Sequence, residues 1–363
     1  MRLRSTAFVV VLVAGACGRS GMLQSPAERA REGGSGGGAG GAFGTGGRAG
    51  TGGSTGTGGA TGGGLGACAG ERGVTEFALP IGRSQPRGIA AGSDGNLWFT
   101  EYNADAIGRI SPSGTITEFP VLTGDSGPFG IVGGRDGNIW FTEVLAHRVG
   151  YATTTGTITE FSLPSDTSLP KSLAIGPDGT PWFTGYLPND VANLSTTGVG
   201  SVLSCRRDGV WVGIAGGPDA NLWITGHGID AICQLSLLGT ATVFELPHQG
   251  SEPWGITAGS DGALWFAEYG GSRIGRITTA GEITEFPTPT ADSYPVNIVA
   301  APSGTLWFTE DKGNNIGCIT TWGEIVEFPI PTPNSGPEGI AIGPDGNIWF
   351  VEQVGNKIGR INQ

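Results

Sequence analysis

The sequence is poor in the residues that carry charge and proton-transfer chemistry. Only 14% of its 363 residues are charged, and it contains 3 histidines. Its 20 Lys and Arg residues are outnumbered by 32 Asp and Glu residues, which gives a formal net charge of −12. Binding to nucleic acid or to an anionic membrane surface depends on an excess of basic side chains. We therefore expect no nucleic acid partner and no direct binding of the folded part to lipid.

Paired cysteine motifs are also missing. The 5 cysteines are scattered through the chain at Cys17, Cys68, Cys205, Cys233 and Cys318. None of them forms a C-x-x-C pair, the spacing of zinc knuckles and of thioredoxin-like redox sites. A Cys205–Cys233 disulfide could form if the chain folds in an oxidising compartment. The signatures of Ser-His-Asp hydrolases, P-loop proteins and HExxH metalloproteases are absent as well.

No apolar run is long enough to cross a membrane. The run from Ala7 to Ala16 has about ten residues, whereas a transmembrane helix needs about 20. It follows Arg2 and Arg4, and its small residues lead directly to Cys17. This pattern resembles a bacterial lipoprotein signal. We predict that residues 1–17 are a signal peptide of the lipoprotein type, with ordinary secretion as the alternative.

A Gly-rich segment follows the signal. Residues 33–66 are almost entirely Gly, Thr, Ser and Ala, and this composition cannot bury enough apolar surface to fold. Residues 18–72 are therefore predicted to be a flexible linker. We expect an exported protein that is either secreted or held in the cell envelope, in the periplasm or at the cell surface. Contact with a membrane would come only through a lipid on Cys17.

What the sequence has in abundance is one repeated phrase. Leu-Trp-Phe-Thr-Glu at residues 97–101 recurs in variant form, with 42, 42, 41, 42, 42 and 42 residues between successive Trp positions. The seven Trp residues are Trp98, Trp140, Trp182, Trp223, Trp265, Trp307 and Trp349. Self-similarity at a nearly fixed period indicates a repeat architecture.

Each repeat contains four short strand signals. In the fifth repeat they are Gly255–Ala258, Leu264–Glu268, Ile274–Ile277 and Ile283–Phe286, separated by turns that contain Gly. No stripe of apolar residues with a helical period occurs. Four strands in each of seven repeats predict an all-β, seven-bladed β-propeller over residues 73–363. We expect a monomer.

The two ends of the array predict how the ring closes. The array begins with a fourth-strand phrase, Val74–Phe77, that has no blade before it, and it ends with a third-strand phrase, Ile358–Ile361. The N-terminal strand should therefore complete the last blade, which removes exposed sheet edges. The Pro-x-Gly-Ile phrase that opens each inner strand should lie near the axis, on the same face as the loop after Trp-Phe-Thr-Glu. We expect ligands at this mouth of the channel.

The repeat resembles a known family. Glu324–Thr332, Ser335–Ile340, Asp345–Glu352 and Asn356–Ile361 are similar to the repeat phrases of the virginiamycin B lyase (streptogramin lyase) family. The resemblance covers the whole array. It implies a seven-bladed propeller and a Mg²⁺-dependent carbon–oxygen lyase that linearises type B streptogramins by elimination, with a His general base.

Both family histidines are replaced in this chain. The resemblance places one His in the sixth repeat, where Val296 stands, and the base in the seventh repeat, where Glu338 stands. Gly336 stands where the family has a Glu, and the family's acidic residue after Trp-Phe corresponds to Glu352 or to its neighbour Gln353. Val296 cannot take a proton. Glu338 could act as a base only if burial raised its pKa from the ordinary value.

The variable residue of Pro-x-Gly-Ile marks the candidate ligand-binding positions. This position holds Arg87, Phe129, Lys171, Val212, Trp254, Val296 and Glu338 in successive repeats. Such chemical variety within a fixed frame is expected of a ring that faces a ligand, although unconstrained loop residues would vary too. We predict ligand contacts for Arg87, Phe129, Lys171, Trp254 and Val296, because Trp and Arg are common binding anchors.

The Glu of the repeated phrase allows two interpretations. It occurs at Glu101, Glu143, Glu268, Glu310 and Glu352. A ring of carboxylates could hold a cation, so Glu268, Glu310 and Glu352 are candidate metal ligands. The alternative is that each Glu pairs with the Arg of Ile-Gly-Arg, because that Arg occurs only in repeats that have the Glu.

Histidines offer a second candidate site. His227 and His248 should lie on the ligand face, near Glu252 and Glu268 at the junction of the fourth and fifth blades. They could form a displaced catalytic or metal site, or they could be polar loop residues. The first expectation for function is a propeller that binds a small cyclic, peptide or glycan ligand, with lyase chemistry altered or lost. The alternatives are an active Mg²⁺-dependent streptogramin lyase and a metal-dependent lactonase-like propeller.

Overall fold

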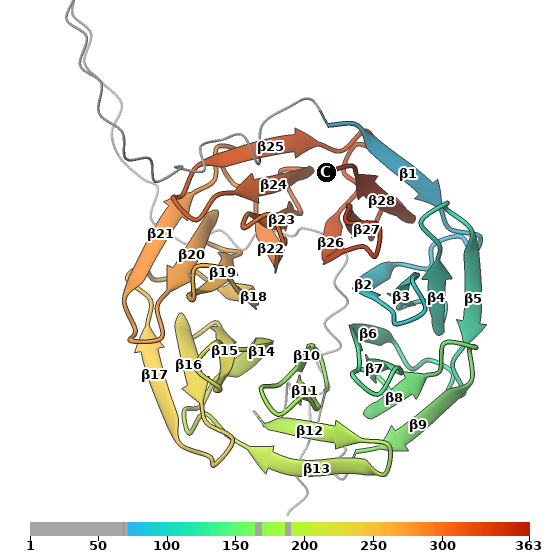
Figure 1. The fold of residues 1–363 in the computed structure, drawn as a ribbon, viewed down its shortest axis with the longest axis horizontal. Helices are drawn as coiled ribbons and strands as arrows, with labels where there is room; N and C mark the ends of the chain where they lie inside the picture. Colours follow the sequence, from blue (N-terminus) through green and yellow to red (C-terminus); the bar gives the residue numbers. More distant parts are fainter. Residues whose placement is uncertain (1–67, 69–71, 164–168, 186–189) are drawn as a thin grey trace, which may run out of the picture. The chain divides into compact units, whose positions relative to one another are not determined.

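The folded part of the chain is the expected propeller. The computed structural model describes residue 68 and residues 72–163, 169–185 and 190–363. Their 28 strands form seven four-stranded antiparallel sheets around a central axis (Figure 1). No helix in the part of the chain described here is long and apolar enough to span a membrane. The predicted signal peptide lies outside the described residues, as does the predicted linker apart from Cys68 and Arg72.

Six blades run from the axis outward in chain order, and in the seventh the outermost strand is the first of the chain. The inner strands are β2 (Pro86–Ala91), β6 (Pro128–Gly133), β10 (Leu173–Ile175), β14 (Val210–Gly216), β18 (Pro253–Ala258), β22 (Pro295–Ala300) and β26 (Pro337–Ile342). The second strands, which carry the repeated Trp, are β3 (Leu97–Glu101), β7 (Ile139–Glu143), β11 (Pro181–Thr184), β15 (Leu222–His227), β19 (Leu264–Glu268), β23 (Leu306–Glu310) and β27 (Ile348–Glu352).

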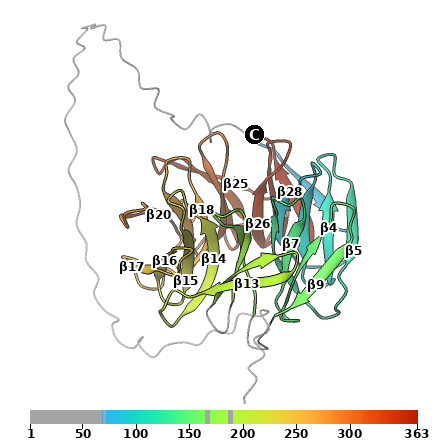
Figure 2. The same cartoon turned by 60° about the horizontal axis from the view of Figure 1, so that its bottom comes forward.

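The two outer layers complete the blades. The third strands are β4 (Ala106–Ile110), β8 (Arg148–Ala152), β12 (Val191–Ser195), β16 (Ala231–Leu235), β20 (Arg273–Ile277), β24 (Asn315–Ile319) and β28 (Lys357–Ile361). The outermost strands are β1 (Val74–Ala78), β5 (Ile116–Pro120), β9 (Ile158–Ser162), β13 (Gly198–Leu203), β17 (Ala241–Glu245), β21 (Ile283–Pro287) and β25 (Ile325–Pro329). Figure 2 shows β5, β9, β13 and β17 along the outer edge of the ring.

The first and last strands of the array share one sheet, as the sequence predicts. Strand β1 pairs antiparallel with β28, from Val74 opposite Ile361 to Ala78 opposite Lys357. The seventh blade therefore has the strand order β1-β28-β27-β26. Because β1 covers the outer edge of β28, the last blade has the same four strands as the others and the ring is closed by backbone hydrogen bonds.

The core lies between blades and is built on the repeated Trp and Phe. All seven Trp side chains of the repeat are 1% exposed or less. Trp349 of the seventh blade packs with Leu97 and Phe99 of the first, so the same contacts continue across the closure. The indole N–H also needs a partner when it is buried. Trp98 Nε1 donates to Asp94 Oδ1 at 3.2 Å, which ties the core to the Asp-Gly turn.

Hydroxyl groups of the second strands position the channel mouth. Thr100 Oγ1 accepts from the Gly88 N–H at 2.9 Å and donates to the Phe129 carbonyl at 2.7 Å, linking one blade to the next. Gly88 allows this close approach, since a Cβ there would lie 2.7 Å from the Phe129 carbonyl oxygen. The same link holds Glu338, whose carbonyl accepts from Thr309 Oγ1 at 2.8 Å. The Pro-x-Gly phrase thus becomes a rigid rim.

Two disulfides tie loops to third strands. The Cys205–Cys233 bridge that the sequence allowed is present, with 6.2 Å between the Cα atoms. A second bridge, Cys68–Cys318, was not foreseen. It fixes the chain just before β1 to β24 of the sixth blade, across a sequence separation of 250. Arg72 continues this contact, because its guanidinium lies 5.4 Å from the Trp307 ring centroid.

Candidate functional site

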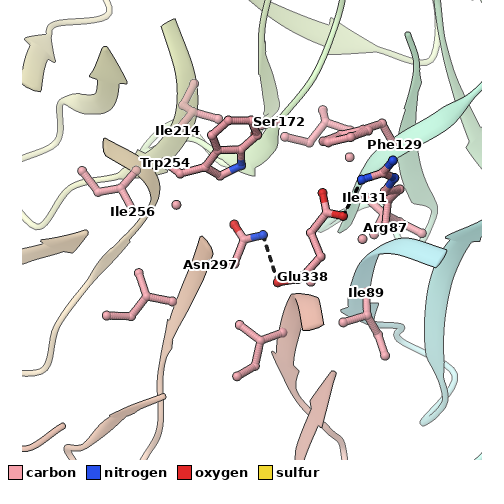
Figure 3. A pocket seen from close by; sticks show the side chains of 18 residues that line it. Arg87, Ile89, Phe129, Ile131, Ser172, Ile214, Trp254, Ile256, Asn297 and Glu338 are labelled. Carbon is pink, nitrogen blue, oxygen red and sulfur yellow. Dashed lines mark hydrogen bonds and ion pairs between the residues drawn. The ribbon is translucent and has the colours of Figure 1, made fainter. Parts of the chain in front are cut away.

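The inner strands enclose a cavity of about 170 Å³ at the axis. Branched aliphatic side chains from all seven blades line it, one at the Ile position of each Pro-x-Gly-Ile phrase. They are Ile89, Ile131, Leu173, Ile214, Ile256, Ile298 and Ile340. The polar and aromatic residues of the lining, among them Arg87, Phe129, Trp254, Asn297 and Glu338, come from the same inner strands (Figure 3). The site is therefore an apolar channel beside a chemically mixed rim.

A buried ion pair closes one side of the rim. Arg87 Nη1 lies 2.7 Å from Glu338 Oε2, and the two side chains are 14% and 11% exposed. The Arg87 guanidinium also lies over the rings of Tyr102, at 5.2 Å, and Phe129, at 5.7 Å. With its amide oxygen turned toward Arg87, Gln353 accepts from both Nη atoms at 2.8 and 3.0 Å. These contacts hold the guanidinium in one place, and Figure 3 shows the ion pair with Glu338 and the neighbouring Phe129 ring.

Glu338 has an altered acidity. Burial raises the pKa of its carboxyl from the ordinary value, and the Arg87 guanidinium opposes that shift. The carbonyl of Glu338 accepts from Asn297 Nδ2 at 3.1 Å, so the backbone is held from the sixth blade. A carboxylate in an ion pair is a poor proton acceptor, because taking a proton would leave the buried guanidinium uncompensated.

Aromatic rings form the opposite side of the rim. Lys171 Nζ lies 4.2 Å from the Trp254 ring centroid and 5.5 Å from that of Phe129. The Trp254 ring is 5.0 Å from the His227 ring, edge to face, and 6.0 Å from that of Tyr269. These side chains offer flat apolar faces next to a cation, an arrangement suited to stacking against a planar or cyclic ligand.

The predicted ligand ring is only partly at the cavity. Arg87, Phe129, Trp254 and Glu338 line it, and Lys171 contacts two of their rings. Val296 is 6% exposed and is not among the residues that line the cavity. Its role as a ligand contact stays a prediction.

The two candidate histidines lie in different surroundings. His227 packs against Trp254, and burial lowers the pKa of its imidazole while the Glu252 charge opposes that change. The exposed His248 instead forms a hydrogen bond with Glu285. Glu285 Oε2 lies 3.4 Å from Arg273 Nε, which is 2.9 Å from Glu268 Oε2. His248 and Glu268 thus belong to one polar network of the fifth blade, whereas His227 packs against Trp254 of the cavity lining.

The predicted pairing of the repeated Glu with the Arg of Ile-Gly-Arg is wrong. Strand register places Arg109 opposite Trp98, and it places Ala106 opposite Glu101. Arg109 therefore stacks on Trp98, with 5.5 Å from Cζ to the ring centroid, near the Asp-Gly turn. Arg276 likewise pairs with an Asp of that turn, Asp261, at 2.7 Å. The Arg lies toward the other end of the strand pair from the Glu.

The repeated Glu side chains are buried away from the cavity, and their pKa values are raised. Glu101, Glu143, Glu268, Glu310 and Glu352 are all 0% exposed, and none is among the residues that line the cavity. Burial raises the pKa of each to about 7.

The donors at the mouth do not fit the Mg²⁺ site that the family resemblance implies. Among the described residues there is no group of three or more His, Cys, Asp or Glu side chains that could hold a metal ion. The Glu338 carboxylate is bound to Arg87, and Gly336 has no donor side chain. Glu352 is fully buried behind the rim.

Sequence reasoning missed a second variable position at the rim. The residue directly after the repeated Glu or Gly brings Tyr102, His227, Tyr269 and Gln353 to the mouth, although only His227 and Gln353 were named from the sequence. Comparing the repeats at this position would have found the others, because it varies as much as the residue in Pro-x-Gly-Ile. Asn297 was missed because most other repeats have Gly there.

Solved structures and a family model resemble this chain. A streptogramin B lyase structure is 37% identical over 80% of this chain and 97% of that chain, with a TM-score of 0.77. Virginiamycin B lyase from Staphylococcus aureus is also 37% identical, over 81% of this chain and all of that chain, with a TM-score of 0.77. A catalytically inactive form of that lyase, solved with quinupristin, is 36% identical over the same shares, with a TM-score of 0.77.

The comparison with curated protein sequences found no match. The model of the Virginiamycin B lyase family matches residues 49–225 and 189–363, so it covers the whole propeller. The chain belongs to the virginiamycin B lyase family.

Proposed function

We propose that this propeller binds a small cyclic or peptidic ligand at its channel mouth, with the lyase chemistry of its family altered or lost. The observation that carries this proposal is the Arg87–Glu338 ion pair at 2.7 Å. Glu338 stands where the family resemblance places the general base. Its carboxylate is paired with Arg87. The described residues contain no group of three or more His, Cys, Asp or Glu side chains that could hold a metal ion.

The rim and channel support binding without that base. The aliphatic ring of the channel accepts an apolar group, while Trp254 and Phe129 offer faces for a ring system. Asn297 and the Arg87–Glu338 pair supply fixed hydrogen-bonding groups beside them. A cyclic peptide carries both kinds of group, and a solved relative was obtained with quinupristin. A glycan, which stacks its rings on aromatic side chains, is the other ligand class that this rim fits.

The test is binding of a type B streptogramin to the purified protein, with product analysis. Quinupristin should quench the fluorescence of Trp254, and Trp254→Ala should weaken binding about tenfold, or by roughly 1.4 kcal/mol. Leu238→Ala is the matched control, since Leu238 is 95% exposed away from the inner strands. Mass spectrometry with and without Mg²⁺ should find the ligand still cyclic. No binding by the unaltered protein would refute a cyclic depsipeptide as ligand.

Retained lyase activity is the second candidate, and one observation favours it. Burial raises the pKa of Glu338, which moves a carboxyl toward the range of a useful base. A linear product formed by the unaltered protein and lost in Glu338→Gln would support this candidate. A metal-dependent lactonase would need a cluster of donors, and the described residues contain no such group.

We also propose that the protein is exported and held at the cell envelope as a monomer. The two disulfides support export, because such bonds persist in oxidising compartments. Labelling of cells with a palmitate analogue should mark the protein through Cys17, and Cys17→Ala should abolish the label. A protein recovered without lipid from the culture medium would favour ordinary secretion instead.

A further inference from the structure

Pairs of carboxylates recur behind the channel rim. In five blades the buried Glu at the end of the second strand faces a Glu of an outermost strand. The pairs are Glu101 with Glu118, Glu143 with Glu160, Glu268 with Glu285, Glu310 with Glu327, and Glu352 with Glu76. Two facing carboxylates repel each other and both only accept hydrogen bonds, so each pair needs a positive or donating group nearby.

In the other blades of this set, the first residue of the third strand supplies such a group. Arg273 Nε lies 2.9 Å from Glu268 Oε2 and 3.4 Å from Glu285 Oε2, between the two carboxylates. Lys357 Nζ lies 2.6 Å from Glu76 Oε2 in the seventh blade. The sixth blade has Asn315, whose Nδ2 donates to Glu310 Oε2 at 3.0 Å. The second blade has Arg148, 3.9 Å from its outer carboxylate.

The first blade has lost this group. The corresponding residue is Ala106, which is opposite Glu101 in the strand register. The first blade also lacks a hydroxyl group that is present in the seventh. There, Thr332 Oγ1 accepts a hydrogen bond from the Lys357 ammonium at 2.6 Å, whereas the corresponding loop residue of the first blade is Ile81. No Lys or Arg among the described residues forms an ion pair with Glu101 or Glu118.

Glu101 is nevertheless completely enclosed. Its side chain is 0% exposed, and neither carboxylate oxygen has a hydrogen-bond partner among the described residues. The same holds for Glu143 and Glu352, but in their blades Arg148 or Lys357 places a positive charge near the pair. The Ser84 hydroxyl lies close enough to oppose the rise in the pKa of Glu101, but it donates its proton to Asn356 Oδ1 at 3.0 Å. Glu118 is half-buried and accepts from the Ile81 N–H at 3.3 Å, so the pair is reached from solvent through the outer strand.

We propose that Glu101 and Glu118 bind a monovalent cation of the ammonium or potassium class between them, in the position that the Arg273 guanidinium takes between Glu268 and Glu285 in the fifth blade. One positive charge between the two carboxylates removes their repulsion and gives the enclosed oxygens of Glu101 a partner. Carboxylate and hydroxyl oxygens suit such hard cations. The site lies outside the cavity lining and is independent of the ligand proposed for the mouth.

A competing occupant is a proton shared by the two carboxyl groups. A proton would satisfy the pair at acid pH, because burial and the Glu118 charge raise the pKa of Glu101 to about 7. Above that pH the Glu101 carboxyl has lost its proton, and the pair then needs a cation. The two occupants are therefore separated by working at pH 8.5 and varying the cation at constant ionic strength.

The test is the melting temperature of the whole protein at pH 8.5 in KCl, NH₄Cl or tetramethylammonium chloride. The small cations should raise it by about 2 °C over tetramethylammonium, which is too bulky to enter. Ala106→Lys, which supplies the ammonium covalently, should be as stable in tetramethylammonium as the unaltered protein is in KCl. Glu101→Gln should lose the difference between cations.

Matched controls separate this site from general screening of an acidic protein. Glu324→Gln removes an exposed charge, and Leu238→Lys adds one at a fully open position, so both should keep the full cation dependence. The proposal is overturned if the unaltered protein melts at one temperature in all three salts, which would indicate a proton alone. It is equally overturned if Glu101→Gln and Ala106→Lys both keep the difference between cations.

Discussion

Arg87 and Glu338 lie 251 residues apart in the chain and form an ion pair of 2.7 Å at the channel mouth. The pair spans the junction between the seventh blade and the first, where β26 and β2 are neighbours (Figure 1). It exists only because the ring closes. Its partners are also the residues that a ligand in the channel would meet, so the same contact links closure to binding.

Breaking this pair on one side should be costly. Arg87→Met leaves the Glu338 carboxylate buried without compensation and is expected to lower the free energy of unfolding by roughly 3 kcal/mol. The double variant Arg87→Met, Glu338→Leu removes both charges and should recover most of that loss. Urea unfolding followed by circular dichroism measures both. Additive losses in the double variant would show that the pair is not coupled.

Stability should fall as the pH rises from about 5 toward 7. The five buried Glu residues have pKa values raised to about 7 from an ordinary 4.5, so the folded state binds more protons than the unfolded state between these values. Their contribution is complete below about pH 4.5 and is lost on the way to pH 7. Hydrogen bonds to Asp94 and Asp345 lower the pKa of each, which opposes burial and favours the fold above acid pH.

Stability is therefore expected to be greatest near pH 5 and lower at pH 8 by about 1–3 kcal/mol for each Glu that loses its proton. Urea unfolding across this range measures the slope. Glu143→Gln has one fewer buried group that titrates, so the fall in its unfolding free energy between pH 5 and pH 8 should be smaller by the contribution of one Glu. Glu324→Gln, at the surface, should leave that fall unchanged. A curve that rises steadily from pH 5 to pH 8 would contradict the assignment.

Reduction should destabilise the ring without opening its sheets. Cys68→Ala removes a bridge that closes a loop of 250 residues, and the loss of a native disulfide typically costs roughly 2–5 kcal/mol. The shorter Cys205–Cys233 loop, of 28 residues, should contribute less. Thermal unfolding of Cys68→Ala, of Cys205→Ala and of the reduced protein gives the comparison. Equal melting temperatures with and without reductant would exclude a stabilising role for both bridges.

The hydroxyl link to Glu338 should matter for both packing and binding. Thr309→Val keeps the shape of the side chain but removes a donor to the Glu338 carbonyl at 2.8 Å and an acceptor for the Asn297 N–H at 3.2 Å. We expect a loss of about 1–2 kcal/mol in unfolding free energy, because both partners are then left with poorer hydrogen bonds. Ligand binding should weaken as well.

Thr100→Val, at the corresponding link in the first blade, is the matched control. It should show a similar cost in stability, since its two bonds of 2.9 and 2.7 Å have the same geometry. It should weaken ligand binding only if the ligand contacts Phe129, whose carbonyl accepts the Thr100 hydrogen bond. Unchanged stability in both variants would show that the links follow from strand packing and contribute little themselves.

The fold could be predicted because its signals are local. Strand-length apolar runs, Asp-Gly turns and a Trp at nearly constant spacing identify blades within single repeats, and the unmatched phrases at the two ends identify the closure. Arg87 and Trp254 could be found because their position varies within a constant frame. The Arg87–Glu338 pair could not, since it depends on which blades become neighbours and on the side-chain directions there.

Other features of the site depend on register and on distant segments. The expected contact between Glu101 and Arg109 fails because antiparallel pairing places Ala106 opposite Glu101, three residues away from the Arg. Cys68 lies in a Gly-rich stretch with no local signal for a partner, and only the folded ring brings it to Cys318. The raised pKa of Glu338 could not be predicted from the sequence either, because it follows from the burial of the side chain in the folded ring.

The Cys68–Cys318 bridge also determines how the domain would respond to tension. A pull on the chain ahead of residue 68 reaches a covalent bond to β24 before it reaches the hydrogen bonds between β1 and β28. The force is then carried by β24, an interior strand of the sixth blade. The hydrogen bonds that hold β1 to β28 at the outer edge of the seventh blade do not bear it. With the bridge reduced, the same force would unzip β1 first. A domain suspended from its N-terminal end would thus keep its ring intact under flow or shear only while that disulfide is oxidised.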